Sequence, residues 1–239
     1  MTYFGIGTAK RRGCTYCERM DTAPELSLPQ IAQFIRQHTH DVCNDLNGLE
    51  LEAVLLSELA PNGEAAESVA RIRGQIRKLA GDLRSLSARF NEPNPTRALY
   101  AASELFLIWQ DQNASLNPAP EVKWSDTLGT EQLNVDAAAL ADVFRELLAN
   151  ALAFGTGAPM LAAARVEDGR AVFELREPKD AAVAPATWGD EPFVAMRHGH
   201  YGLGLWAARR TISASGGEVR RRFVQDTMEL ATTLIFPVA

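Results

Sequence analysis

The chain has 239 residues, of which 46% are hydrophobic, and a formal net charge of -6. This acidic balance disfavours a nucleic-acid backbone as the main partner, because neutralising phosphates requires clustered Lys and Arg. No stretch approaches the roughly 18 to 20 consecutive apolar residues of a membrane span, and the N-terminus lacks the apolar core of a secretory signal, so we expect a cytoplasmic location. The length and the change of pattern near the middle favour two small domains.

The first 25 residues are predicted to form a flexible tail. This tail contains a lone Cys-x-x-Cys pair, Cys14 and Cys17, without the second pair of ligands that a structural zinc site usually has. Ordinary reduced thiols are the better interpretation, and we assign the pair no role. The tail is too short for a sensor domain, so we expect any input signal to come from elsewhere.

Residues 26–92 are predicted to form a helical hairpin. Apolar residues recur at three- and four-residue steps from Leu28 to Leu59, and again up to Phe90, which indicates two amphipathic helices. Between them, residues 60–63 (Ala-Pro-Asn-Gly) are strong turn formers, and the prolines at 93 and 95 mark the domain boundary. Because one apolar stripe per helix buries little alone, we expect a homodimer with a four-helix bundle.

His40 is the candidate reactive residue of the hairpin. At about 100° per residue it falls opposite the apolar stripe, whereas His38 falls on the stripe and is predicted to be a core or interface residue. Asn44 follows one turn after His40, and Asp41 lies at the edge of the same face. A carboxylate that accepts one ring N–H leaves the other nitrogen as a nucleophile toward phosphorus. The alternative is that a surface helix happens to carry His-Asp-x-x-Asn.

Residues 96–239 mix helices with hairpins, which indicates an α+β sandwich. We expect helices over residues 96–112, 135–154 and 202–215, the second of them capped by Asp136. A short strand is predicted at residues 121–124. An Asp-Gly turn should join strands at 160–166 and 171–175, and two closing strands are expected at 218–222 and 228–236.

Three motifs in this order resemble those of the two-component histidine kinases. Residues 146–151 (Glu-Leu-Leu-Ala-Asn-Ala) resemble the N box of these kinases and of ATPases of the gyrase, heat-shock-90 and MutL type. Residues 202–205 (Gly-Leu-Gly-Leu), followed by a helix and Ser-Gly-Gly, resemble the glycine-rich second nucleotide box. Residues 39–44 (Thr-His-Asp-Val-Cys-Asn) then resemble the phosphoacceptor box. The resemblance covers roughly residues 28–237 and implies a phosphotransfer hairpin followed by a histidine-kinase-type ATPase domain.

The resemblance also implies a site for ATP and Mg²⁺. Asn150 takes the position of the residue that binds the Mg²⁺ bridging the ATP phosphates. Glu146, one turn earlier, would orient the attacking group or a water near the metal. Gly202 and Gly204 resemble glycines whose missing side chains let backbone amides approach phosphate. Glu177 takes the place of the carboxylate that accepts a hydrogen bond from the adenine amino group.

The adenine-binding motif is degenerate. The family normally has Asp-x-Gly-x-Gly, but residues 177–181 are Glu-Pro-Lys-Asp-Ala. Lys179 and Ala181 therefore replace both glycines and crowd a site that depends on close backbone approach. Ala153 also stands where a lysine of the N box often contacts phosphate.

Three functions are compatible with these motifs. The first is a histidine kinase that charges His40 from Mg-ATP and passes the phosphoryl group to the Asp of a response-regulator receiver domain. The second is a histidine phosphotransferase or receiver phosphatase with a non-functional ATP site, in which Asn44 positions a hydrolytic water. The third is a non-catalytic dimeric adaptor, for which no phosphoryl group reaches the hairpin.

Overall fold

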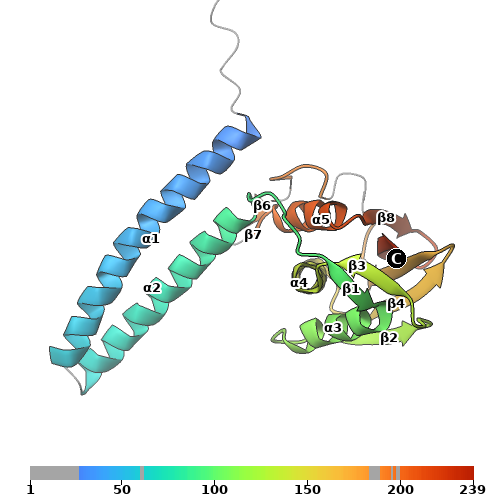
Figure 1. Ribbon diagram of the computed structural model, residues 1–239. Helices are drawn as coiled ribbons and strands as arrows, with labels where there is room; N and C mark the ends of the chain where they lie inside the picture. The colour runs from blue at the N-terminus through green and yellow to red at the C-terminus, as the bar shows by residue number, and fades with distance from the viewer. Residues whose placement is uncertain (1–26, 60–61, 183–188, 195, 198–199) are drawn as a thin grey trace, which may run out of the picture. The chain divides into compact units, whose positions relative to one another are not determined.

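The structure is a computed structural model that describes residues 27–59, 62–182, 189–194, 196–197 and 200–239. The predicted tail with Cys14 and Cys17 lies outside these residues, as do positions 60 and 61 of the predicted turn. The chain divides into two compact units, one ending at Ser87 and the other spanning Ala88–Ala239 (Figure 1). Within the described ranges, no helix has both the length and the apolar composition that crossing a membrane requires.

The first unit is the predicted helical hairpin of α1 (Leu28–Leu59) and α2 (Glu64–Ala88). Its buried seam is narrow, because the buried residues of α1 recur at seven-residue intervals, as in a coiled coil: Ala32, Thr39, Leu46 and Ala53. The two helices are also tied by Glu50, whose Oε1 accepts hydrogen bonds from Arg73 Nε at 3.1 Å and Arg77 Nη2 at 2.7 Å.

The predicted apolar stripe of α1 is only partly buried in this hairpin. Leu49 and Leu56 remain 50% and 53% exposed, because the seam runs along one edge of the stripe. His38 is exposed and its ring stacks on Phe34 with 5.7 Å between centroids. His38 is therefore not a core residue of the single hairpin, and its predicted place at an interface stays a prediction.

The second unit is an α+β sandwich, as predicted. Its five-stranded sheet has the order β2-β4-β5-β9-β8, in which β2 and β4 are parallel and every other neighbouring pair is antiparallel. The strands span Val122–Asp126 (β2), Met160–Glu167 (β4), Arg170–Pro178 (β5), Glu218–Val224 (β8) and Glu229–Pro237 (β9). The predicted hairpin of β4 and β5 is confirmed, and its turn residues Asp168 and Gly169 both have positive φ.

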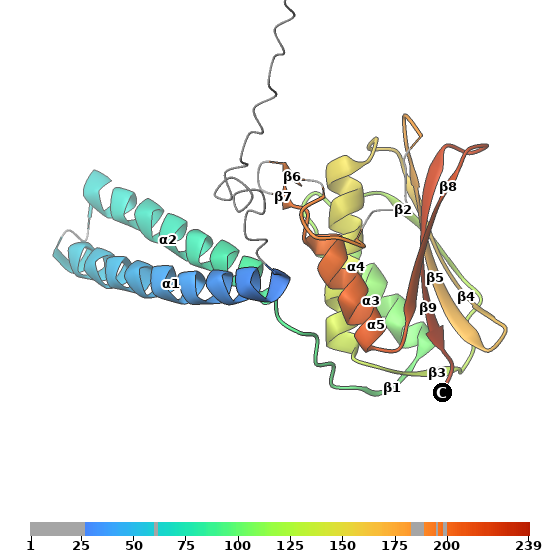
Figure 2. The same cartoon turned by 90° about the horizontal axis from the view of Figure 1, so that it is seen from above.

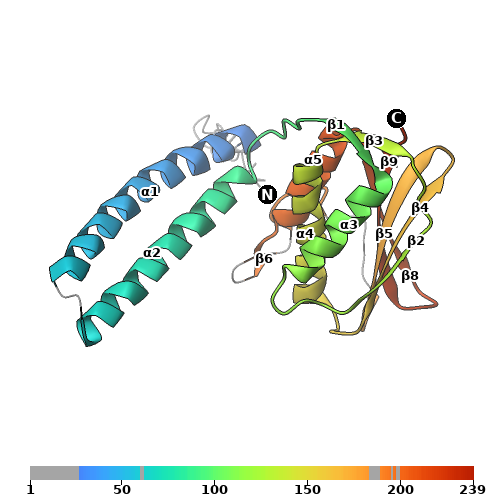
Figure 3. The same ribbon diagram turned by 60° about the horizontal axis from the view of Figure 1, so that its bottom comes forward.

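Three helices cover one face of this sheet (Figure 2): α3 (Ala102–Ala114), α4 (Ala137–Phe154) and α5 (Gly204–Ala214). Helix α4 lies between α3 and α5 and contacts both (Figure 3). Between the layers, the rings of Trp109 and Phe144 stack at 4.9 Å, and Phe173 of β5 meets the Trp109 ring edge-on. All three side chains are fully buried, so this aromatic cluster anchors the helices on the sheet.

The prediction of one helix over residues 96–112 is wrong at its start. Ala98–Ala101 form strand β1, which pairs antiparallel with β3 (Gln132–Val135), and α3 begins only at Ala102. The sequence Ala-Leu-Tyr-Ala suits a helix, but the ladder with β3 satisfies its backbone groups and overrides that preference. A short hairpin of β6 (Met196–Arg197) and β7 (His200–Tyr201) precedes α5.

Asp136 fixes the start of α4, as predicted. Its Oδ1 accepts a hydrogen bond from the Ala139 amide at 3.0 Å, and its Oδ2 accepts one from the Thr96 amide at 2.8 Å. The bond from Ala139, with that from Thr96, lowers the pKa of the Asp136 carboxyl. One carboxylate therefore caps the central helix and holds the segment that precedes β1.

We expect Asp136→Ala to lower the free energy of unfolding of the second unit by about 1–2 kcal/mol, because it removes a helix cap. The tryptophan fluorescence of urea-unfolded samples measures this loss, since all the tryptophans follow residue 88. Because the folded-state pKa is lowered, the Asp136 carboxylate gives its full stabilisation at neutral pH. The difference in free energy of unfolding between wild type and variant is therefore largest there. It shrinks as the pH falls below about 4, through the folded-state pKa, and the carboxylate is protonated. Asp142→Ala on the same helix is the control, since this side chain is 71% exposed. Equal losses for the two variants would contradict the capping role.

Candidate functional site

The reactive residues predicted for the hairpin lie together on one exposed face of α1. The His40 side chain is 70% exposed. Its Nδ1 lies 3.3 Å from Asp41 Oδ1 and 3.3 Å from Asn44 Nδ2. Gln37 Nε2 donates a hydrogen bond to the same oxygen of Asp41 at 2.9 Å, which holds the carboxylate in place. The Nε2 atom is the ring nitrogen that these contacts leave for chemistry.

The two contacts of His40 Nδ1 belong to different tautomers. When Nδ1 carries the proton, it donates to Asp41, and Nε2 has a lone pair that can attack phosphorus. When Nδ1 is unprotonated, it accepts from the Asn44 amide, and Nε2 carries the hydrogen instead. Asp41 therefore favours the nucleophilic form of His40, and Asn44 competes with it for the same atom.

In the second unit, Glu146 and Asn150 lie one turn apart on α4, as predicted. Asn150 Nδ2 donates to the Glu146 carbonyl at 2.8 Å and to Glu146 Oε1 at 3.1 Å. Arg89 Nη2 donates to the other carboxylate oxygen, Glu146 Oε2, at 3.0 Å. The Glu146 carboxylate is therefore held between an amide and a guanidinium, both supplied by the chain itself.

Gly204 begins α5 directly beside this carboxylate. A Cβ built at Gly204 would overlap Glu146 Oε1 and would lie 2.8 Å from Arg89 Nη1, so a larger residue would require these two side chains to move. Gly202 has φ +66°, a left-handed conformation that also favours glycine. The local structure thus explains why glycine stands at both positions of the predicted phosphate loop. The space beside Gly204 is occupied by the side chains of Glu146 and Arg89.

Glu177 and Lys179 form a buried ion pair at the end of β5. The two residues are 7% and 8% exposed, and Lys179 Nζ lies 2.7 Å from Glu177 Oε2. The same ammonium donates to the carbonyl of Phe154, the last residue of α4, at 3.2 Å. The carboxylate that resembles the adenine acceptor is therefore already hydrogen-bonded to the residue that replaces the first glycine of the motif.

Arg221 of β8 adds a third charge near this pair. Burial lowers the pKa of its guanidinium to about 10; the nearby Arg209 acts in the same direction and Glu177 opposes it. Arg209 in turn forms an ion pair with Asp190. Gly189 closes over Arg221, because a Cβ built there would lie 3.2 Å from Arg221 Nη1. Charged side chains therefore crowd this end of the predicted nucleotide site.

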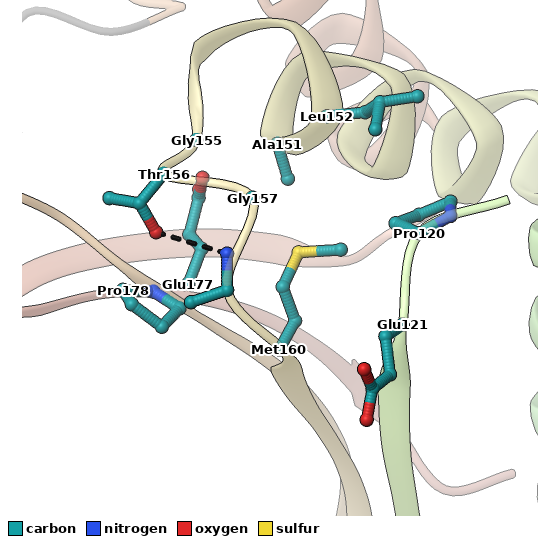
Figure 4. A pocket seen from close by; sticks show the side chains of 11 residues that line it. Pro120, Glu121, Ala151, Leu152, Gly155, Thr156, Gly157, Met160, Glu177 and Pro178 are labelled. Atoms are coloured by element: carbon teal, nitrogen blue, oxygen red, sulfur yellow. Dashed lines mark hydrogen bonds between the residues drawn. The ribbon is translucent and has the colours of Figure 1, made fainter. Parts of the chain in front are cut away.

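Figure 4 shows a small pocket between the end of α4, the loop that follows it and the start of β2. Glu177, Leu152 and Met160 are among its lining residues. Asn150, Gly202 and Gly204 are absent from that lining. The pocket is therefore not formed by the residues predicted to hold phosphate and metal.

Asn150 is the predicted metal ligand, and its amide oxygen is the atom with the chemistry to bind Mg²⁺. In the part of the chain that the structure describes, no three His, Cys, Asp or Glu side chains are grouped to hold a metal ion. Mg²⁺ often takes only one or two protein ligands together with phosphate oxygens, so Asn150 fits that partial role. The adenine end fits its ligand less well, because Lys179 already donates to Glu177.

Sequence reasoning missed Arg89 and Arg221 as parts of this site. Arg89 contacts a residue 57 positions later, and no spacing rule connects the two. Arg221 could have been found from the sequence, because strand alternation places it on the same side of β8 as Val219 and Phe223. A charge among inward-facing apolar residues of a strand marks either a buried partner or a site.

Removing one member of the buried pair, with Glu177→Leu or Lys179→Met, should lower the free energy of unfolding by about 3–5 kcal/mol, because the other charge stays buried and loses this ion pair. The double variant should lose less than the sum of the two single losses. Urea unfolding followed by tryptophan fluorescence measures all three.

The exposed pair of Glu218 and Arg220, at 2.8 Å, is the control in the same unit. Glu218→Leu and Arg220→Met should each cost much less than the variants of the buried pair, because an exposed ion pair contributes little to stability. Strictly additive losses at Glu177 and Lys179 would contradict the importance of their pairing.

No protein-family model and no curated protein matches the chain. Among solved structures it is similar to full-length ShkA in complex with AMPPNP, with a TM-score of 0.66 and 21% identity, over 87% of this chain and 46% of ShkA. The chain thus spans less than half the length of ShkA.

The chain is also similar to the histidine kinase AdeS of Acinetobacter baumannii, with a TM-score of 0.50 and 16% identity, over 82% of this chain and 94% of AdeS. The catalytic domain of the histidine kinase ThkA has a TM-score of 0.50 and 13% identity, over 59% of this chain and 95% of that domain. The chain therefore has the fold of the histidine kinases, a helical hairpin followed by an ATPase-type α+β sandwich.

Proposed function

We propose that the chain is a histidine phosphotransfer protein, in which His40 carries a phosphoryl group and exchanges it with the aspartate of a response-regulator receiver domain. The observation that carries this proposal is the exposed imidazole of His40, whose Nδ1 lies beside the Asp41 carboxylate. Such a residue is accessible to a second protein and is oriented by its neighbour.

The transfer uses the Nε2 lone pair of His40. This lone pair attacks the phosphorus of an aspartyl phosphate, the N–P bond forms, the acyl P–O bond breaks, and the aspartate leaves as a carboxylate. Asp41 accepts a hydrogen bond from the Nδ1–H group and stabilises the positive charge that develops on the ring. The reverse reaction passes the group to another receiver by the same geometry. Asn44, whose amide contacts the same ring nitrogen, supports a phosphatase activity as an additional outcome.

The exposed apolar face of the hairpin supports a homodimer. Leu49 and Leu56 of α1 and Ile72 and Leu79 of α2 are each 50–53% exposed and recur at seven-residue intervals. Burying such stripes against a second hairpin would complete a four-helix bundle. The apolar area that the single hairpin leaves in water is the driving force for this pairing.

A second pair of leucines supports receiver docking. Leu51 and Leu55 are 68% and 59% exposed, and helical geometry places them on the side of α1 that carries His40, roughly three to four turns farther along. Apolar contacts of this kind, next to an exposed reactive group, suit a partner that binds transiently. Their separation from the stripe of Leu49 and Leu56 allows the two surfaces to be tested independently.

An ATP-dependent histidine kinase is the second candidate. It is favoured by the similarity to ShkA, whose structure contains AMPPNP, and by the position of Asn150. It requires the Glu177 carboxylate to release Lys179 before adenine can bind.

Receiver domains charged with labelled acetyl phosphate should transfer label to the full-length chain, because His40 attacks their acyl phosphate. His40→Gln should abolish the transfer. His38→Gln is the matched control, since that ring is also exposed but is stacked on Phe34. The label should survive alkali and be lost in acid, as a phosphoramidate is. Label that persists in His40→Gln, or no label from any receiver, would refute the proposal and leave the adaptor function.

Leu49→Glu with Leu56→Glu should convert the dimer into a monomer, because two charges would enter the bundle core. Light scattering coupled to size-exclusion chromatography measures this change. Leu51→Glu with Leu55→Glu should leave the dimer intact but slow the transfer from receivers at least tenfold, since loss of a few apolar contacts weakens docking by that amount. A monomeric wild-type chain would contradict the bundle, and an unchanged transfer rate would contradict the docking surface.

A further inference from the structure

We infer that this chain fills its own nucleotide site, with Lys179 in the role of the adenine amino group and Glu146 with Arg89 in the space beside the glycine loop. The inference concerns the phosphoryl donor for His40 and rests on the proposed function. Two independent groups of contacts support it, one at each end of the site.

At the adenine end, Lys179 already donates a hydrogen bond to the Glu177 carboxylate, which adenine would need as its acceptor. The adenine amino group would donate an N–H to Glu177, but Lys179 Nζ donates to that side chain at 2.7 Å. Both groups are more than nine-tenths buried. Adenine would therefore have to displace a charge-assisted hydrogen bond with a neutral one, which is weaker. It would also separate the Lys179 ammonium from the Glu177 carboxylate in a site with little water.

Lys179 is also held at two further atoms. Its ammonium donates to the carbonyl of Phe154 at the C-terminus of α4, the end of a helix that favours a positive charge. Its backbone amide donates to the Met228 carbonyl at 2.8 Å, in the turn before β9. The Lys179 ammonium therefore has fixed partners, and its backbone amide is fixed as well. Moving it aside breaks contacts to α4 and to β5 together.

At the phosphate end, a carboxylate stands where an anion would approach. Glu146 Oε1 lies against Gly204 at the start of α5, where the helix dipole favours negative charge. Arg89 neutralises that carboxylate at 3.0 Å. A phosphate could approach Gly204 only if this ion pair moved, because the side chains of Glu146 and Arg89 occupy the space beside the glycine. The chain thus supplies its own anion and its own cation at the place where resemblance predicts phosphate.

These contacts bear on the donor of the phosphoryl group on His40. A nucleoside triphosphate bound in this domain is not that donor, because its site is filled by side chains of the chain itself. Under the proposed function, the aspartyl phosphate of a receiver domain is then the donor.

A titration of the full-length chain with a fluorescent ATP analogue and Mg²⁺ tests this inference. The wild type should show no saturable binding. Glu177→Asp with Lys179→Gly and Ala181→Gly rebuilds the Asp-x-Gly-x-Gly motif and should bind saturably, with a Kd at least tenfold below the highest analogue concentration at which the wild type shows no saturation, a gain that one restored hydrogen bond provides. Unlabelled ATP should compete with the analogue, whereas inorganic triphosphate should compete poorly. Lys123→Gly is the control, since this lysine is exposed on β2.

Tight binding by the wild type that is lost in Asn150→Ala would overturn the inference. A rebuilt variant that folds, judged by its thermal transition, but binds no better than wild type would overturn the role of Lys179. If the rebuilt variant does not fold, the titration and labelling of the wild type alone test whether the site is filled. The chain is then incubated with Mg-ATP labelled on the γ-phosphate, and label that depends on His40 would refute the inference.

These results are distinguishable from a failure of the proposed function. Label that reaches His40 from ATP would overturn the self-filled site but keep His40 as the phosphoryl carrier. No nucleotide binding together with no label from charged receivers would keep the self-filled site but overturn the carrier. Label from receivers alone supports both.

Discussion

The ion pair between Glu177 and Lys179 joins the end of β5 to the last turn of α4, in a place with almost no access to water. Charges can remain in such a place only when each has a partner held in good geometry. The Lys179 ammonium meets both a carboxylate and a helix-end carbonyl, so the strand, the helix and the turn before β9 are fixed by one residue. The region that resembles a nucleotide site thus contributes to the packing of the domain.

The two units of the chain place their charged groups very differently. On the hairpin, the exposed side chains of His40, Asp41 and Asn44 make hydrogen-bond contacts with one another and with a glutamine. In the sandwich, Glu146 and Glu177 are each paired with a cation of the same unit. Exposed groups can change partners at little cost, whereas paired and buried groups cannot. This contrast supports the proposal that phosphoryl exchange takes place on the hairpin.

Local patterns in the sequence predicted most of the fold. The bounds of α1, the cap at Asp136 and the β4–β5 hairpin follow from periodicity, capping chemistry and an Asp-Gly turn, all of which act within a few residues. Strands β1 and β3 were missed because they are stabilised by each other across about 30 intervening residues. His38 is not in the core of the single hairpin because the seam between the helices is narrower than the apolar stripe.

The candidate site was predictable only in part, for the same reason. His40, Asp41 and Asn44 lie within two turns of one helix, so a helical wheel brings them together. Lys179 was recognised as an obstacle from its position in the motif, but its contact with Phe154 depends on how α4 packs against β5. Arg89 reaches Glu146 from another part of the chain altogether. Short-range chemistry can be predicted from spacing, and long-range pairing cannot.

The seam of the hairpin contains small side chains at both ends, Ala32 and Ala53, with Ala80 buried on the facing helix. Small residues let the helices approach closely but bury little apolar area, so the larger leucines are left on the outside. If these leucines pair between two copies, folding of the hairpin becomes coupled to association, and its stability depends on protein concentration by mass action. The amount of dimer would then rise more steeply than the amount of chain synthesised, so that expression level would set how much of the hairpin is folded.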